Sequence, residues 1–575
     1  MLPHFVLLVV AVFLGCSAES YRKEADEEVY GELDRLQKAL FGEERPFTVD
    51  PPADSLRQKL LAEMQAASSA SPPLATPPDG AGAEEGSAER ESARGQERAQ
   101  EEGVHRLTLL NCLDIAAGNS RDYQRQKETV FLRVLDLTFE RYLFTSRYFA
   151  TADSTYNRSG GGEGGSNSRS ISSEGSVGFN RQLASGGQML LSFAGSLLKR
   201  FTGVSTGRES SSVLSLSFAQ PLLSGAGEKI ALEPLTQAER DAIYALRSFE
   251  RSRMELAVRI ASDYYRLVQQ RAQIQNEADN VKTVEESLLR TRSMADENRI
   301  PLFQVDQAEQ DLLRAQNRLV LVQQQYETQL DNFKVTLGLP TDAPVDIVAP
   351  DLEQARNKGL ESSSIAEERA LAIALRFRQD LLNAREAVED SQRKVEVAAD
   401  ALRAGLDFSG SVDLGSEPSQ PLDFSLDYTD YSLGLGLDLP IDRVQERNAY
   451  RTALIALEQA RRSAEQTEDE VKLDVRAALR ALDQAYETYE IQRRAVELAA
   501  TRVDSTEALQ LFGRVETRDV LEAKQAHVQA LNSLDAAITD HQVSRLELLR
   551  DMGVLRIDVE GLTYDESAEL PDVHP

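Results

Sequence analysis

Two stretches of the chain carry the same pattern 215 positions apart. Residues 299–319 read RIPLFQVDQAEQDLLRAQNRL, and residues 514–534 read RVETRDVLEAKQAHVQALNSL. An ungapped alignment, extended to the glycine that closes each tract, superposes Arg299, Val305, Ala308, Gln310, Ala315, Asn317, Leu319 and Gly338 on Arg514, Val520, Ala523, Gln525, Ala530, Asn532, Leu534 and Gly553. The predicted elements around both stretches follow the same order, so the pattern indicates an internal duplication.

Long helices make up most of each repeat. Helical periodicity predicts tracts at 228–297 and 302–337, and again at 443–511 and 517–553. At ~1.5 Å per residue the first tract would reach roughly 100 Å, which is longer than a compact core requires. Apolar residues recur near a 3.5-residue period, which is typical of coiled-coil seams. The seams are Ala257, Ile260, Tyr264, Leu267, Ile274, Ala278, Val281 and Leu288 in the first repeat, and Val471, Val475, Ala478, Leu482, Ala485, Tyr489, Val496, Ala499 and Val503 in the second.

A strand pattern precedes the long helices in each repeat. Residues 147–220 and 407–439 contain period-two stretches, clearest at Leu214–Phe218 in the first repeat. In the second repeat the alternation is Leu433, Leu435, Leu437 and Leu439 against Gly434, Gly436 and Asp438. Lipid offers the backbone no hydrogen-bonding partners, so strands span a membrane only as a closed sheet. Each repeat supplies too few strands, and we expect several protomers to close a shared β-barrel. A soluble two-sheet domain with helical arms is the alternative.

The N-terminus has the features of a secretory signal. Leu2–Gly15 is apolar, too short to span a bilayer and followed by small residues. Phe13–Cys16 resembles a bacterial lipobox, so residues 1–15 are predicted to be a signal peptide and Cys16 the acylated first residue of the mature protein. An ordinary signal with an incidental cysteine is the alternative. Cys112 is the only other cysteine, so no disulfide framework is expected.

Composition divides the remainder of the chain. Residues 16–65 are charged and locally helical, whereas residues 66–106 are rich in Ala, Ser, Pro, Gly and Glu. The second segment has too few large apolar side chains to offset its ordering entropy, and we expect a disordered linker there. The repeats are assigned to 107–345 and 346–555, and residues 556–575 to an acidic tail.

Charge and motifs exclude several functions. A net charge of −30 argues against nucleic-acid binding, which requires clustered Lys and Arg. No histidine lies in a metal-binding or catalytic motif. The five are His4, His105, His527, His541 and His574. We therefore expect no catalytic residue, no metal and no cofactor, and a protein that is not an enzyme.

Several motifs resemble those of TolC-type outer membrane efflux proteins. Gln220–Gly227 closes a strand and opens a long helix as at a junction of that family, and Leu439–Ile441 stands at the equivalent place in the second repeat. Gly513–Val515 and Asp519–Ala523 are similar to the family's second hairpin tip. The resemblance covers about 107–555.

The resemblance implies a mainly α fold with a membrane β-barrel, formed by a homotrimer. Three copies would share a barrel in the outer membrane lipid, with two strands per repeat, above a periplasmic α-barrel of long coiled-coil helices. Residues 147–220 hold more strand candidates than two, so the strand count of the first repeat stays open. It implies the exit duct of a tripartite efflux pump or a type I secretion system, in which a periplasmic adaptor connects the duct to an inner-membrane transporter. The alternative is a lipid-anchored structural coiled-coil protein of the envelope without a pore.

The hairpin tips are candidate docking sites. A helix that reverses direction often needs one residue in the left-handed region, which Gly and Asn tolerate best, and Asn298 and Gly513 are equivalent in the two repeats. The resemblance implies that Asn298, Arg299 and Ile300, with Gly513, Arg514 and Val515, meet the adaptor. The alternative is that these residues only turn the chain.

Two carboxylates beyond the second tip form a candidate constriction. Asp519 and Glu522 are three residues apart, hence on one helical face, and threefold symmetry would set them in rings that favour cations. The resemblance implies a periplasmic gate at this position, although Glu522 replaces the family's usual Asp and the first repeat has Gln304 opposite Asp519. A solvated acidic face is the alternative.

Overall fold

The computed structural model describes thirteen segments of the chain. These are residues 17–42, 47–50, 55–62, 105–159, 168–202, 207–297, 299–348, 359–360, 365–417, 420–439, 441–512, 514–558 and 561–564. The predicted signal peptide, Cys16, Asn298, Gly513 and nearly all of the predicted linker lie outside the described residues.

The chain divides into two compact units. The first contains residues 1–47, 129–247 and 383–466, and the second contains 48–128, 248–382 and 467–575. Four of their five boundaries fall within helices, namely α6 (Arg121–Leu143), α8 (Glu233–Asp296), α12 (Gln379–Asp400) and α13 (Val444–Leu511).

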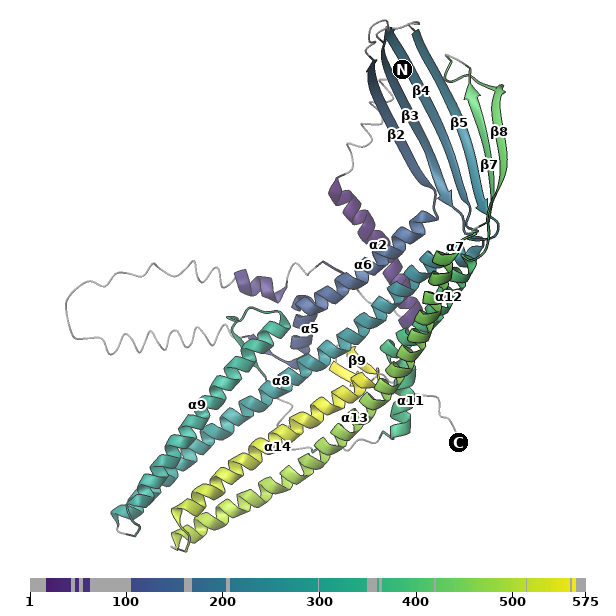
Figure 1. Ribbon diagram of the computed structural model, residues 1–575. Helices are drawn as coiled ribbons and strands as arrows, with labels where there is room; N and C mark the ends of the chain where they lie inside the picture. Colours follow the sequence, from purple (N-terminus) through teal and green to yellow (C-terminus); the bar gives the residue numbers. More distant parts are fainter. Residues whose placement is uncertain are drawn as a thin grey trace, which may run out of the picture. The chain divides into compact units, whose positions relative to one another are not determined.

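The first unit contains one antiparallel sheet of six strands, seen in Figure 1. Its strands, in sheet order, are β2 (Arg147–Ser159), β3 (Ser168–Gln182), β4 (Gln188–Thr202), β5 (Gly207–Pro221), β7 (Gly405–Ser416) and β8 (Phe424–Asp438). The expectation of two strands per repeat is therefore wrong for the first repeat, which supplies four. The physical reason is that the alternating pattern of 147–220 is long enough for four strands, with a tight turn at Leu183–Gly187 between the middle two.

Helices of the first unit are joined by ion pairs and aromatic contacts. Helix α2 (Ala18–Phe41) begins at an N-cap formed by Ser17 and contacts α6 through the rings of Tyr30 and Phe131, whose centroids are 5.8 Å apart. Between α8 and α12, the Arg240 guanidinium lies 2.8 Å from Glu386, and the Tyr244 hydroxyl donates to Asp390 at 2.6 Å. These polar contacts fix the register between the two helices.

The second unit contains two long helical hairpins. One pairs α8 with α9 (Phe303–Leu337), and the other pairs α13 with α14 (Thr517–Asp551). The four helices begin and end within about five residues of the predicted tracts. The hairpins contact each other, since the Asn276 amide donates to Asn532 at 2.8 Å.

Short helices repeat in the second unit and make the duplication visible in space. Helix α5 (Leu109–Asn119) breaks at Ser120 before α6, and α11 (Glu367–Phe377) breaks at Arg378 before α12. The glycines that end α9 and α14, Gly338 and Gly553, are both left-handed, with φ of 78° and 74°. A Cβ on Gly338 would meet Asn119 at the first break, and one on Gly553 would meet Phe377 at the second.

Two small sheets complete the second unit. β1 (His105–Leu107) pairs in parallel with β6 (Val345–Ile347), so residues 105 and 106, which were assigned to the linker, belong to a strand. β9 (Leu555–Asp558) and β10 (Gly561–Tyr564) form an antiparallel pair, so the segment predicted as an acidic tail begins with a strand.

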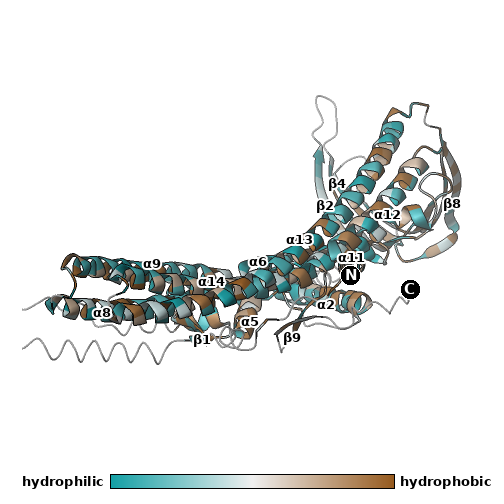
Figure 2. Ribbon diagram, turned by 90° about the horizontal axis from the view of Figure 1, so that it is seen from below, coloured by the Kyte–Doolittle hydropathy of each residue, from teal (hydrophilic) through white to brown (hydrophobic). Residues whose placement is uncertain are grey.

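The core of the second unit is built from the predicted seams. One cluster gathers Tyr264, Leu267, Phe333, Tyr489 and Ile538 from four helices. Figure 2 shows hydrophilic and hydrophobic residues mixed along the helices. Accordingly, no described helix carries an apolar stretch long enough to cross a membrane.

Candidate functional site: the sheet faces and the hairpin tips

The register of the six strands divides their side chains into two faces. Residues that pair across neighbouring strands lie on the same face of the sheet. The pairings from β2 through to β8 therefore show on which face each paired residue lies. One face is apolar on all six strands. Its members are Tyr148, Ala150, Ala152 and Tyr156 on β2; Ile171, Val177 and Phe179 on β3; Met189, Leu191, Phe193 and Leu197 on β4; Leu214, Leu216 and Phe218 on β5; Leu406, Phe408, Val412 and Leu414 on β7; and Tyr431, Leu433, Leu435 and Leu437 on β8.

This apolar face is exposed in the single chain. Tyr148 is 80% exposed, Leu433 77% and Leu435 71%. Aromatic rings contact each other across neighbouring strands, as in Tyr148 with Phe179 at 5.9 Å and Phe218 with Phe408 at 6.4 Å. An apolar patch of this extent needs an apolar environment, and an outward apolar band flanked by aromatic rings is the usual surface of a strand wall in lipid.

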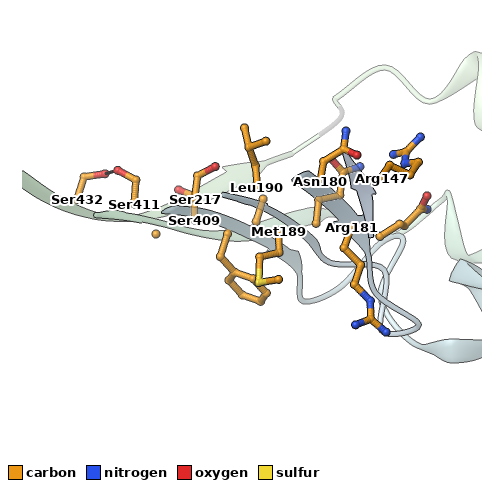
Figure 3. A pocket seen from close by; sticks show the side chains of 14 residues that line it. Arg147, Asn180, Arg181, Met189, Leu190, Ser217, Ser409, Ser411 and Ser432 are labelled. Atoms are coloured by element: carbon orange, nitrogen blue, oxygen red, sulfur yellow. Dashed lines mark hydrogen bonds between the residues drawn. The ribbon is translucent and has the colours of Figure 1, made fainter. Parts of the chain in front are cut away.

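The opposite face is small and polar. Hydroxyl groups bond across the strands, as between Thr151 and Ser176 at 2.7 Å and between Ser411 and Ser432 at 2.9 Å. Figure 3 shows Ser411, Ser432 and Ser217 on one side of the sheet and Met189 on the other. A shallow hollow of about 380 Å³ opens on this polar side near the base of the strands.

Carboxylates give the polar face a negative charge. Asp153 lies opposite Glu174 across the β2–β3 pair, and Asp413 opposite Asp430 across the β7–β8 pair. Like charges directly opposite one another destabilise a sheet, and water with dissolved cations reduces that cost. The polar face is therefore suited to an aqueous compartment.

The first hairpin tip places two of the three predicted residues, Arg299 and Ile300, near the helix reversal. Arg299 is exposed and its guanidinium lies 2.9 Å from Glu297, while Ile300 is half-buried. The backbone N–H of Arg299 donates to the Met294 carbonyl at 2.9 Å, which closes the end of α8. Asn298, the predicted left-handed residue, is not among the described residues.

The second tip is organised by a capping box. The backbone N–H of Asp519 bonds to the side chain of Glu516, the N-cap of α14, and the Asp519 carboxylate accepts the Glu516 N–H at 3.3 Å. Arg514 is exposed and Val515 half-buried, whereas Gly513 lies outside the described residues. Asp519 thus has a structural role of its own at the start of the helix.

Glu522 has a charged partner that the sequence did not reveal. Its carboxylate lies 3.1 Å from the Arg502 guanidinium on α13, and both side chains are exposed. One turn away, the Lys524 ammonium lies 2.7 Å from Glu507. Glu522 and Glu507 are therefore each opposed by a cation of the facing helix, so the second tip is less negative than the sequence implied.

The two tips also bond to each other. The Thr517 hydroxyl donates to Gln304 at 3.2 Å, and Gln304 is the residue equivalent to Asp519 in the first repeat. Val284, Ala308 and Leu521 form a buried apolar cluster behind this bond. The structure therefore brings both predicted docking sites to one end of the second unit.

Exposed apolar stripes run along the outer helices of the hairpins. At about 100° per residue, Leu473, Ile491, Leu498 and Leu509 fall on one line of α13, opposite the buried seam that contains Val471. On α9, Leu313 and Val320 are exposed opposite buried Ala308 and Ala315. The described part of the chain covers only one of the two apolar sides of each helix.

The described part of the chain offers few side chains for metal binding or catalysis. Its residues include no cluster of three or more His, Cys, Asp or Glu side chains that could hold a metal ion. His527 and His541 lie apart on α14. Cys112 is buried, and burial raises the pKa of its thiol to about 12.

The fold resembles that of several solved channels. It is similar to the Campylobacter jejuni CmeC outer membrane channel, with a TM-score of 0.57 and 13% identity over 84% of this chain and 94% of that one. The outer membrane protein VceC of Vibrio cholerae gives a TM-score of 0.57 and 14% identity, over 77% and 96%. The MtrE outer membrane channel of Neisseria gonorrhoeae, solved in an open state, gives a TM-score of 0.54 and 14% identity. The match covers 77% of this chain and 88% of that one. The fold is that of an outer-membrane efflux channel.

The sequence of the second repeat agrees with this channel fold. The family described as outer membrane efflux protein matches residues 370–554. A comparison with curated protein sequences found no match. The expected fold class is thereby confirmed.

Two features of the structure were missed by sequence reasoning. The Arg502–Glu522 pair joins residues of two different helices, and no local spacing indicates it. The exposed stripe of α13 was readable, because its residues recur at multiples of the helical period opposite the seam.

Proposed function

We propose that three copies of the chain form a passive export duct across the outer membrane and the adjoining periplasm. The observation that carries the proposal is the six-stranded sheet with one apolar and one polar face, both exposed in the single chain. Such a sheet fits a wall between lipid and water. The apolar stripes of α9 and α13 support the same assembly, because copies arranged in a ring would cover them with each other.

The energy for transport would come from a partner in the inner membrane. We propose that the duct serves a tripartite efflux pump or a type I secretion system through a periplasmic adaptor. Arg299, Ile300, Arg514 and Val515, with Asn298 and Gly513, are the proposed docking residues, supported by the bond between Gln304 and Thr517 that holds the two tips together.

Asp519 and Glu522 are the proposed constriction, in a modified form. Asp519 also caps α14, and Glu522 is paired with Arg502. The proposal is therefore a ring of ion pairs whose net charge depends on Arg502.

We propose that Cys16 carries the lipid anchor. Phe13–Cys16 resembles a bacterial lipobox, and this resemblance supports the proposal. Intact mass of the mature protein tests this, since acylation adds the mass of the lipid and Cys16→Ala removes it. An unmodified mass for the wild-type chain excludes the anchor.

The test of the function compares the duct with a structural coiled-coil protein. Heat-resistant trimers in the outer-membrane fraction, together with ion channels in planar bilayers, are expected for the duct. A structural envelope protein without a pore would give neither. Trimers that never conduct would exclude the duct.

A further inference from the structure

We propose that the β2–β3 hairpin is part of the membrane wall, and that the β2 edge pairs with the β8 edge of a second copy. The proposal rests on the trimeric duct above. Six strands from each of three copies then give a wall of eighteen strands. Two strands per repeat would have given twelve.

The two outer strands of the sheet are open edges. β2 pairs only with β3, and β8 only with β7, among the described strands. Soluble proteins protect such edges with proline, lysine or short strands. β2 and β8 contain neither proline nor lysine and are 13 and 15 residues long. Edges of this length without such protection are free to form backbone hydrogen bonds with a strand of another copy.

Strand direction allows the two edges to pair around a ring. All neighbouring strands of the sheet are antiparallel, and the number of strands is even. β2 and β8 therefore run in opposite directions. When β8 of one copy meets β2 of the next, the new pair is antiparallel as well, and the closed sheet has the same pairing throughout.

The faces also match across the new seam. On β2, Tyr148, Ala150 and Ala152 continue the apolar face, and Thr151 and Asp153 continue the polar face. Pairing with β8 would place them beside side chains of the same kind, such as Leu433 on the apolar face. If the β2–β3 hairpin were surrounded by water on both sides, it would not need one apolar and one polar face.

The outer ends of β2 to β5 supply an independent observation. Beyond the apolar band, four exposed basic side chains lie on the apolar face, namely Arg158, Arg169, Lys199 and Arg208. Arg158 lies opposite Arg169, and Lys199 opposite Arg208, which is unfavourable unless anions lie nearby. Phosphates of lipid head groups would offset this repulsion. The basic side chains set the same lipid boundary on β2 and β3 as on β4 and β5.

A wall of eighteen strands is wider than one of twelve. With strands about 4.8 Å apart and tilted by roughly 40°, the backbone diameter rises from about 24 Å to about 36 Å. The enclosed area rises about twofold. The extra hairpin thus sets the width of the outer opening.

Cysteine cross-linking tests the seam. Ala150→Cys or Ala152→Cys on β2 is combined with Leu433→Cys or Leu435→Cys on β8, because all four lie on the apolar face. The parent chain, with Cys112 buried, is the background. Oxidation is expected to give covalent dimers and trimers on non-reducing gels.

The matched control places the first cysteine on β4. In a twelve-stranded wall without the β2–β3 hairpin, β4 would be the free edge, and Leu191→Cys with Leu433→Cys would cross-link. The proposal expects none. Cross-links from β4, or native trimers that show no β2–β8 cross-link, would overturn it. Absence of trimers from every variant, judged by sedimentation, would instead overturn the duct on which it rests.

Discussion

Arg502 sets the charge available at the second hairpin tip, because its guanidinium lies 3.1 Å from Glu522. Arg502→Gln leaves Glu522 without that partner, and we expect a more cation-selective channel, with a several-fold larger cation-to-anion permeability ratio, since an acidic ring attracts cations. Glu522→Gln should shift the ratio in the opposite direction. Reversal potentials in planar bilayers measure both.

A test of the Asp519 charge requires a substitution that preserves the capping box at the start of α14. Asp519→Asn retains an oxygen that can accept the Glu516 N–H, so the helix start is preserved while the charge is lost. Unchanged selectivity and conductance in the Asp519→Asn/Glu522→Gln double variant would remove the constriction from the function of these residues.

Val515 tests the docking proposal. Val515→Asp places a charge beside the second tip, and we expect cross-linking to a periplasmic adaptor to fall at least tenfold while heat-resistant trimers still form. Ser505→Asp introduces the same charge about two turns earlier on α13 and should leave cross-linking intact. Equal cross-linking in both variants would count against docking at the tip.

The buried thiol of Cys112 is expected to make the stability of the fold fall as the pH rises. Burial raises the pKa of its thiol from 9.0 to about 12. The contribution of the neutral Cys112 thiol to the free energy of unfolding is fully present below pH 9. It is lost as the pH rises from 9 to about 12, because in that range the thiol ionises in the unfolded chain but not in the folded one. The folding equilibrium constant of the wild type should fall by about tenfold per pH unit there, relative to Cys112→Ala. Denaturant unfolding at pH 8, 10 and 11 measures this. Parallel curves for both proteins would contradict it.

The ends of helices α9 and α14 offer a comparison between equivalent elements. A Cβ on Gly338 would lie 2.1 Å from the Asn119 carbonyl oxygen, and one on Gly553 would lie 3.1 Å from the Phe377 carbonyl. Both glycines are left-handed, so alanine strains each of them. We expect Gly338→Ala to destabilise by about 2–3 kcal/mol and Gly553→Ala by about 1–2 kcal/mol.

Gly31 on α2 is the matched control for these glycines. A Cβ there meets nothing within 4 Å, so Gly31→Ala should be neutral or stabilise by up to ~1 kcal/mol. Thermal unfolding midpoints distinguish the three variants. A Gly338→Ala protein as stable as the wild type would show that the two helix ends can move apart without cost.

The helices were predictable and the strands only in part. Seam residues such as Tyr264 and Val475 repeat along many turns, and Gly338 and Gly553 mark the helix ends, so the signal is strong and local. In the first repeat the strands carry many Ser and Gly residues, whose weak alternation left the number of strands open. The polar contacts of the tips, such as that between Gln304 and Thr517, join residues distant in sequence. No spacing rule predicts such contacts.

The proposed trimer would depend on the apolar stripe of α13. Leu473→Glu or Ile491→Glu would place an unpaired charge in the contact with a second copy, and we expect at least tenfold weaker association. Ala481→Glu adds the same charge on an exposed position about 80° around the helix and should leave trimers intact. Sedimentation and heat-resistant bands on gels provide the measurement. Trimers that survive Leu473→Glu would place the contact elsewhere.

The unequal supply of strands, four from one repeat and two from the other, has a consequence for symmetry. The two repeats are alike in their helices, so three copies would present six nearly equivalent hairpins and a tube of almost sixfold symmetry. The strand wall would have only threefold symmetry, with broad arcs from first repeats alternating with narrow arcs from second repeats. In that wall the acidic pairs of β2–β3 and β7–β8 would be gathered in three sectors, so a solute passing through it would meet a field of threefold rather than sixfold symmetry.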